Sequence, residues 1–364
     1  VVIIAVMTTI CVIGTELSAK VQRVLVFAQV GALLLFVVVA TIRLLLGDVP
    51  AGSIDPSLSW LNPFAISDYS ALLSGMLLAV FIYWGWESAV NLTEESEDSA
   101  RSPGLAGLTS TVILLFTYIT VAITMIAVAG LDEVARFDDD PGLFGAVAED
   151  VLGPFSFVLV LAIITSGLAS TQTTILPASR TSLSMATAGA FPKAFARIHP
   201  RFETPDFGTI AIGAVATLWY VGASIVSENF LFDSLSALSL MIAFYYGLTG
   251  IACAIYWRRE LGSSLKNFLL IGAGPVIGAL ALFYLLYESV IELADPADSY
   301  SGDSVLGLGV PLAIALFFSA LGVIAMVAWR FSSYGRPFFS RHGWESVPPE
   351  VARDLTLGPT APGS

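Results

Sequence analysis

The sequence has few charged residues. Asp, Glu, Lys and Arg make up only 12% of its 364 residues, whereas a soluble domain carries about 25%. Hydrophobic residues make up 56%, and they occur in blocks that approach or exceed the roughly 20 residues needed to cross a bilayer. The shortage of charge therefore excludes an ordinary soluble domain and predicts a polytopic membrane protein.

Cysteine and histidine are also scarce. Cys11 and Cys253 both lie inside apolar runs, and His199 and His342 are too far apart in sequence to suggest a metal cluster. The pattern excludes a disulfide framework and does not indicate a zinc site. A membrane-embedded enzyme would need a nucleophile with a base, or His or Cys pairs, inside the apolar blocks. The sequence has none, so we expect no enzyme activity and no cofactor.

Nine apolar blocks divide the chain, and the polar sequences between them are rich in Pro, Gly and Asp. Lipid offers no water to a loop backbone, so each block is predicted to be a helix. Together they predict an all-α membrane domain over residues 1–330, followed by a solvated tail at 331–364. The blocks cover residues 1–14, 24–46, 70–90, 105–130, 153–175, 208–226, 231–257, 267–288 and 306–330.

The start of the sequence carries no Met and no basic leader, and its first block is short for a span. We therefore expect the chain to begin inside a helix, with further sequence before Val1.

Basic residues are distributed unevenly over the loops. If the blocks alternate in direction, Arg43 and Arg136 fall on one side and the other 14 of the 16 Lys and Arg fall on the opposite side. The positive-inside rule places the second side in the cytoplasm, together with the C-terminus. The net charge of -13 comes mostly from the outer loops, and we interpret it as a solubility feature. The single basic patch at 191–205 does not indicate nucleic-acid binding.

The stretch FIYWGWESAVNLTEE at 81–95 interrupts an apolar block with Gly85 and Glu87. A charged side chain in the centre of a membrane helix costs about 2.5–3.5 kcal/mol. Glycine leaves its backbone unshielded, which is tolerated at membrane depth only inside protein or beside an aqueous cavity. The stretch therefore predicts either an unwound segment facing a cavity, or a helix end at Gly85 with Glu87 already at the interface. Trp84 and Trp86 fit an interfacial belt equally well. Spacing alone favours neither.

Hydroxyl side chains gather in a second block, ITSGLASTQTTILPASR at 164–180. Ser170, Thr173 and Thr174 share one helical face, because they are separated by three and four residues. Small hydroxylated residues serve helix packing in lipid, and the residues alone favour that interpretation. A cation site is the alternative, because hard cations prefer oxygen ligands.

These motifs resemble the amino acid–polyamine–organocation permease superfamily. FIYWGWESAVNLTEESEDSARSPG resembles that family's sixth helix, in which an aromatic-Gly-aromatic-acid break precedes an EE…P loop. ASTQTTILPASRTSLSMATAGAFPKAFARIHPRFETP resembles its eighth helix and the following loop, and GTELSAKVQRV resembles the loop before its fifth helix. The resemblance implies a five-plus-five inverted-repeat fold, of which this chain would supply helices four to twelve. With the first three helices absent, these 364 residues alone would not transport.

The resemblance also implies a substrate site at the interrupted helix. The backbone carbonyls of Phe81, Ile82 and Tyr83 would receive a substrate ammonium group, with Gly85 at the helix break. Phe81 and Trp84 would form the wall of the side-chain pocket.

Coupling residues follow from the same resemblance. Glu87 would be an acid linked to proton transfer or to gating. Gln29 stands where some members place a lysine that mimics sodium, so that proton carrier would be missing. Ser170, Thr173 and Thr174 would be candidate sodium ligands. Coupling to Na⁺ and coupling to H⁺ both stay open.

The sequence therefore predicts a secondary active transporter of the cytoplasmic membrane. It would move amino acids or related amines by alternating access, with the lipid bilayer and a small-molecule substrate as its partners. An antiporter of the same fold is one alternative, and a non-transporting sensor or enzyme is another. No span repeats a pore signature, which disfavours a channel.

Overall fold

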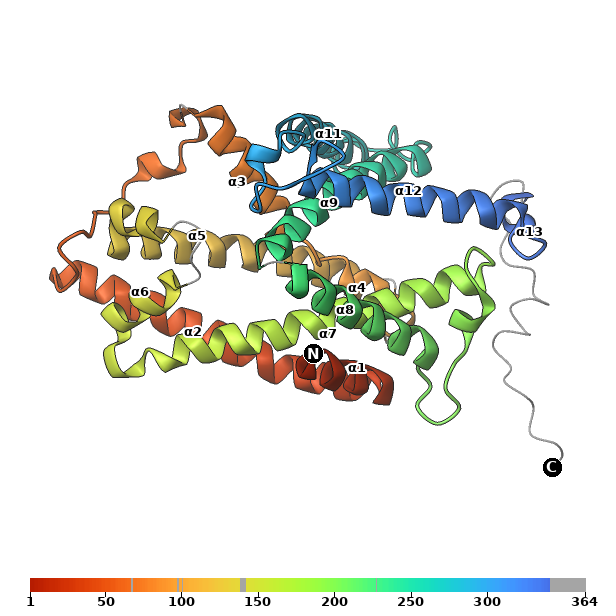
Figure 1. Cartoon of the computed structure of the whole chain (residues 1–364), viewed down its shortest axis with the longest axis horizontal. Coiled ribbons are helices and arrows are strands. Elements are labelled where there is room, and N and C mark those ends of the chain that lie inside the picture. Colours follow the sequence, from red (N-terminus) through yellow and green to blue (C-terminus); the bar gives the residue numbers. More distant parts are fainter. Residues whose placement is uncertain (67, 97, 100, 138–141, 227, 341–364) are drawn as a thin grey trace. The chain divides into compact units, whose positions relative to one another are not determined.

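The computed structural model describes residues 1–66, 68–96, 98–99, 101–137, 142–226 and 228–340 (Figure 1). Over these residues the secondary structure is helical except for one short two-stranded hairpin, which confirms the predicted all-α fold. The longer helices are α1 (Val2–Ile13), α2 (Thr15–Leu46), α3 (Tyr69–Ile82), α5 (Ser102–Arg136), α6 (Leu143–Leu152), α7 (Phe157–Thr187), α8 (Asp206–Val226), α9 (Glu228–Tyr256), α11 (Gly274–Glu292) and α12 (Val310–Phe331).

Short elements connect these helices. β1 (Ser304–Val305) pairs antiparallel with β2 (Leu308–Gly309). The π-helical turn η6 (Phe268–Ala273) joins α10 to α11 without a loop. The remaining short helices are α4 (Ser88–Asn91), α10 (Leu265–Asn267), α13 (Arg336–Ser340), η1 (Leu58–Leu61), η2 (Pro63–Ala65), η3 (Thr93–Glu95), η4 (Gly153–Phe155), η5 (Lys193–Ala196) and η7 (Pro296–Asp298).

Seven helical stretches within the described residues are long and apolar enough to cross a membrane. They are α2, α5, α7, α8, α9, the stretch from α10 to α11, and α12. The two other predicted spans correspond to α1 and α3, which are apolar helices of 12 and 14 residues. Each of the nine predicted blocks is therefore centred on a helix, and the polytopic membrane architecture is confirmed.

The chain divides into two compact units, and the first contains most of its N-terminal half. This unit comprises Val1–Ala65, Gly85–Thr217 and the described residues from Pro337 onward. In Figure 1, α2 and α7 lie side by side within it. Its larger core joins α2, α5, α6 and α7, and a smaller one joins α1 to α7 around Cys11 and Ile175.

The second unit comprises Ile66–Trp84 and Leu218–Arg336. Its core gathers Leu77 from α3, Ala237 and Leu240 from α9, and Leu312 from α12. The predicted division into a membrane domain at 1–330 and a tail at 331–364 stays a prediction, because 341–364 lies outside the described residues. Asp138, Asp139 and Asp140 of the predicted acidic loop also lie outside them.

Candidate functional site

The predicted interruption of the apolar block is present. α3 ends at Ile82 and α4 begins at Ser88, and residues 83–87 form successive turns. Gly85 has φ +111°, a conformation that side chains with a Cβ disfavour. Both sequence-based alternatives, an unwound segment and a helix end at Gly85, require a lapse of helical structure here, so the lapse does not decide between them. Whether the segment faces a cavity stays a prediction.

The Glu87 side chain is hydrogen-bonded to the backbone of the interruption. Its carboxylate oxygen Oε2 accepts a hydrogen bond from the Gly85 N–H at 3.2 Å. The Gly85 carbonyl accepts from the Ser88 N–H at 3.0 Å, and the Phe81 carbonyl accepts from the Trp84 N–H at 3.0 Å. Glu87 is half-buried. The carboxylate is thus held beside the unwound backbone by a contact within the same turn.

Most residues of the interrupted stretch that belong to the second unit, 81–84, are aromatic. The Trp84 indole Nε1 donates a hydrogen bond to the Tyr245 hydroxyl of α9 at 2.7 Å. Phe81, Tyr83 and Trp84 are half-buried, and Ile82 is 37% exposed. Their assignment as substrate-binding residues is not tested by these positions and stays a prediction.

On the side of the first unit, α4 is fixed against α5 and α7. Gly107 of α5 lies so close to Trp86 that a Cβ on it would meet the Trp86 ring and carbonyl at 3.4 Å. The Ser88 hydroxyl donates to the Thr173 carbonyl of α7 at 3.5 Å. That carbonyl has no helical donor four residues later, because Pro177 has no N–H. Ser88 therefore supplies a partner for a backbone group that the proline leaves unpaired.

The three candidate sodium ligands differ in exposure. Thr173 is half-buried, whereas Ser170 and Thr174 are exposed. The Thr173 hydroxyl donates to the Ala169 carbonyl at 3.0 Å, and the Thr174 hydroxyl donates to the Ser170 carbonyl at 2.9 Å. Each hydroxyl oxygen keeps acceptor capacity after donating its proton. Their role as sodium ligands stays a prediction.

Gln29 lies on α2, and its carbonyl oxygen Oε1 is buried with no hydrogen-bond partner among the residues that the structure describes. A buried acceptor without a donor is unfavourable in a low-dielectric interior. An amide does not titrate, and the correspondence of Gln29 to the lysine of the resembled family stays a prediction.

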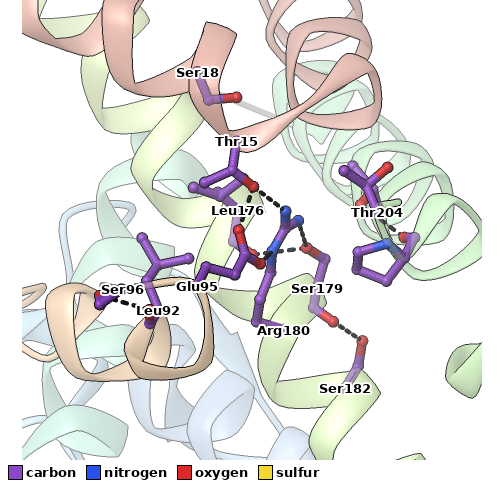
Figure 2. A network of polar contacts seen from close by, with 12 residues as sticks. Thr15, Ser18, Leu92, Glu95, Ser96, Leu176, Ser179, Arg180, Ser182 and Thr204 are labelled. Atoms are coloured by element: carbon purple, nitrogen blue, oxygen red, sulfur yellow. Dashed lines mark hydrogen bonds and ion pairs between the residues drawn. The ribbon is translucent and has the colours of Figure 1, made fainter. Parts of the chain in front are cut away.

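Sequence reasoning missed a buried polar network in the first unit. Figure 2 shows the Arg180 guanidinium of α7 surrounded by Thr15, Glu95 and Ser179. Its Nε lies 2.7 Å from Glu95 Oε1, and its NH1 and NH2 donate to Ser179 Oγ at 2.9 Å and Thr15 Oγ1 at 2.8 Å. The Thr15 hydroxyl also donates to Glu95 Oε2. The network joins the start of α2, the end of η3 and α7.

Neutral contacts reinforce the same junction. The Gln172 amide of α7 donates to the Ser18 carbonyl of α2 at 2.7 Å, and Gln172 is 1% exposed. The Thr204 hydroxyl donates to the Val12 carbonyl of α1 at 2.6 Å. Together with Arg180 and Glu95, these contacts fix α1, α2 and α7 around the residues that follow the interruption.

Comparison with known proteins places the chain in a family. Residues 1–299 match the family described as "Amino acid permease". An uncharacterized transporter of Mycobacterium tuberculosis is 27% identical over 239 residues, covering 66% of this chain and 50% of that protein. A branched-chain amino acid permease of Bacillus subtilis is 22% identical, covering 79% of this chain and 57% of that protein.

A third relative is a low-affinity putrescine importer of Escherichia coli, which is 25% identical and covers 73% of this chain and 60% of that protein. The chain spans about half the length of the first relatives it matches. All three relatives are named as transporters or permeases, which agrees with the expectation that the chain is not an enzyme. The family match covers most of the sequence, and the chain belongs to the amino acid permease family of the amino acid–polyamine–organocation superfamily.

Proposed function

We propose that the protein is a secondary active transporter of amino acids or related amines, and that residues 81–87 form part of its substrate site. One observation carries the proposal: helical structure lapses between Ile82 and Ser88, and Gly85 in this break has φ +111°. A segment without helical hydrogen bonds can absorb large φ/ψ changes, as hinges do.

Contacts on each side of the break support this role. Within the second unit, Trp84 is bonded to Tyr245 of α9, and Ser70 at the start of α3 donates to Glu292 of α11 at 2.6 Å. Within the first unit, Ser88 is bonded to α7 and Trp86 packs on Gly107 of α5. The residue before Gly85 is therefore held by α9 and the residues after it by α5 and α7, which supports a hinge at Gly85.

The chemistry of the segment suits a substrate that carries an amine. Carbonyl groups of an unwound helix accept hydrogen bonds from an ammonium group, and aromatic faces attract cations. Glu87 adds a carboxylate to the same turn. The names of two relatives, a branched-chain amino acid permease and a putrescine importer, support the same class of substrates.

Glu87 is also the proposed coupling or gating acid, with sodium at Ser170, Thr173 and Thr174 as the alternative source of coupling. Replacing Glu87 with Gln keeps the shape of the side chain and removes its charge. In proteoliposomes containing the full-length protein, Glu87→Gln should reduce turnover more than substrate binding. Glu260→Gln, at an exposed residue after α9, is the matched control. Equal transport by wild type and Glu87→Gln would contradict the role of this acid.

The proposed orientation places the loop 191–205 and the C-terminus in the cytoplasm, because 14 of 16 basic residues lie on that side. Single cysteines at Glu203 and Ser57, both exposed, can test this in a background without Cys11 and Cys253. In intact cells an impermeant thiol reagent should label position 57 and not position 203. The reverse pattern would overturn the orientation and leave the transport proposal standing.

A further inference from the structure

Tyr245 lies 161 residues from Trp84 in sequence and meets it at the end of α3. The Trp84 indole N–H donates to the Tyr245 hydroxyl at 2.7 Å, a short distance for a neutral pair. The Tyr245 ring packs edge-on against Tyr246 at 4.6 Å between ring centroids. The hydroxyl that accepts the indole hydrogen bond thus belongs to a ring that packs against a neighbouring ring.

The backbone at Trp84 is not helical, so it does not by itself fix the direction of the indole side chain. α3 has ended at Ile82, so the helix no longer limits the directions available to the Trp84 side chain. The one hydrogen bond described for its backbone N–H is the turn contact to Phe81. The contact with Tyr245 therefore restrains an indole whose backbone has left the helix.

Packing between α3 and α9 directs Tyr245 toward this position. Leu77 of α3 and Ala237 of α9 belong to one buried cluster. Tyr245 lies eight residues after Ala237 in the continuous helix α9, so the two residues share one helical face. Gly247 packs on Phe283 of α11, about 200° around α9 from Tyr245. Tyr245 therefore continues the face of α9 that packs on α3.

We propose that Tyr245 is a positioning residue: its hydroxyl fixes the direction of the Trp84 indole and, through it, the side-chain selectivity of the substrate site. The selectivity part rests on the proposed function, in which Trp84 forms a wall of the pocket. The positioning part does not, because it concerns only the conformation of Trp84.

A direct test of positioning does not need transport. The chain has seven Trp, and labelling the full-length protein with 5-fluorotryptophan gives each of them a fluorine resonance. Trp84→Phe identifies the Trp84 signal by its loss. Tyr245→Phe removes only the hydroxyl and should shift or broaden that signal, while the other Trp signals report an intact fold. Tyr287→Phe, at a 62% exposed tyrosine of α11, should leave the Trp84 signal in place.

Tyr245→His is the second variant, because an imidazole nitrogen can also accept the indole hydrogen bond. It should leave the Trp84 signal nearer its wild-type position than Tyr245→Phe does. An unchanged Trp84 signal in Tyr245→Phe, or an equal displacement in both variants, would overturn the positioning role.

Selectivity is measured as the ratio of kcat/KM for substrates with a large and a small side chain. A single neutral hydrogen bond corresponds to about a two- to tenfold change, so Tyr245→Phe should change the ratio by that amount. In the Trp84→Phe background, Tyr245→Phe should change it no further. A fluorine shift with an unchanged ratio would overturn the selectivity part. Absence of all transport would instead contradict the proposed function and leave the fluorine result to decide the positioning part.

Discussion

Arg180 and Glu95 form an ion pair that joins α7 to the residues after the helix break, with 2.7 Å between Arg180 Nε and Glu95 Oε1. The Arg180 side chain is only 6% exposed, and the Glu95 side chain is 32% exposed. Thr15 contacts both members of the pair. The segment after the break is therefore fixed to two helices of the first unit by a charged contact that water reaches from one side only.

The first prediction concerns this pair. Glu95→Gln leaves the Arg180 guanidinium buried without its counter-charge, which is strongly destabilising in protein interiors. Because Glu95 is partly exposed, we expect a loss of about 2 kcal/mol in the free energy of unfolding, which is less than the roughly 3–5 kcal/mol for breaking a fully buried pair. Chemical denaturation of the purified protein in detergent measures it.

The control for Glu95 is an exposed pair at the start of α2. Glu16 lies 2.8 Å from Lys20, and both side chains are mostly exposed. Glu16→Gln should leave the free energy of unfolding almost unchanged, because solvent screens such pairs. Equal losses of unfolding free energy for Glu95→Gln and Glu16→Gln would show that the Arg180–Glu95 pair stabilises the protein no more than an exposed pair does.

The second prediction compares one substitution at two glycines. Gly85 has φ +111° and open space around its Cα, with Ser88 Oγ the nearest atom at 4.0 Å from an added Cβ. Gly85→Ala should therefore destabilise the protein by about 1–2 kcal/mol through backbone conformation alone. Gly75 lies inside α3 with nothing within 4 Å of an added Cβ. Gly75→Ala should be neutral or stabilising, and a matching sign at both positions would contradict the break.

The third prediction tests the contact between Ser88 and the Thr173 carbonyl. Ser88→Ala should reduce the free energy of unfolding by about 1 kcal/mol, because the carbonyl loses its partner. Pro177→Ala restores a backbone N–H that can bond to the same carbonyl. In that background Ser88→Ala should cost less, and a double-mutant cycle of denaturation midpoints measures the difference. Additive effects would mean that Ser88 does not compensate for the proline.

The fourth prediction addresses the candidate sodium ligands. Thr173→Val and Thr174→Val remove a hydroxyl with little change in volume, so only the oxygen ligand is lost. If sodium binds here, both should weaken the sodium dependence of uptake, measured by varying Na⁺ against choline at constant ionic strength. Thr109→Val is the control, because its hydroxyl donates to the Leu105 carbonyl of α5 in the same back-bonded geometry. Unchanged sodium dependence in both variants would exclude the site.

Local signals made the spans and the break predictable from sequence. Long apolar blocks identify membrane helices, and Gly85 with Glu87 inside one block marks where helical structure lapses. At this block the sequence predicted one span over 70–90, whereas α3 ends at Ile82. The turn at 83–87 and the short α4 account for the difference, because most of their residues are apolar and so extend the predicted block.

Side-chain partners could not be read from the sequence. Thr15, Glu95 and Arg180 are separated by 80 and 85 residues, so no helical periodicity connects them. Arg180 was recognised only as a basic residue of the cytoplasmic side, and its burial depends on how α7 packs on α2. Ser170, Thr173 and Thr174 were placed correctly on one helix, but helical spacing does not determine which of their hydroxyls faces protein.

Uptake by the purified full-length protein in proteoliposomes tests the central claim most directly. The measurement follows radiolabelled amino acids and putrescine under an imposed sodium or proton gradient, with protein-free vesicles as the control. We predict saturable uptake of at least one compound that carries an amine, competed by the unlabelled compound and reduced by Glu87→Gln. Folded protein that shows no saturable uptake of any such compound under either gradient would contradict the account.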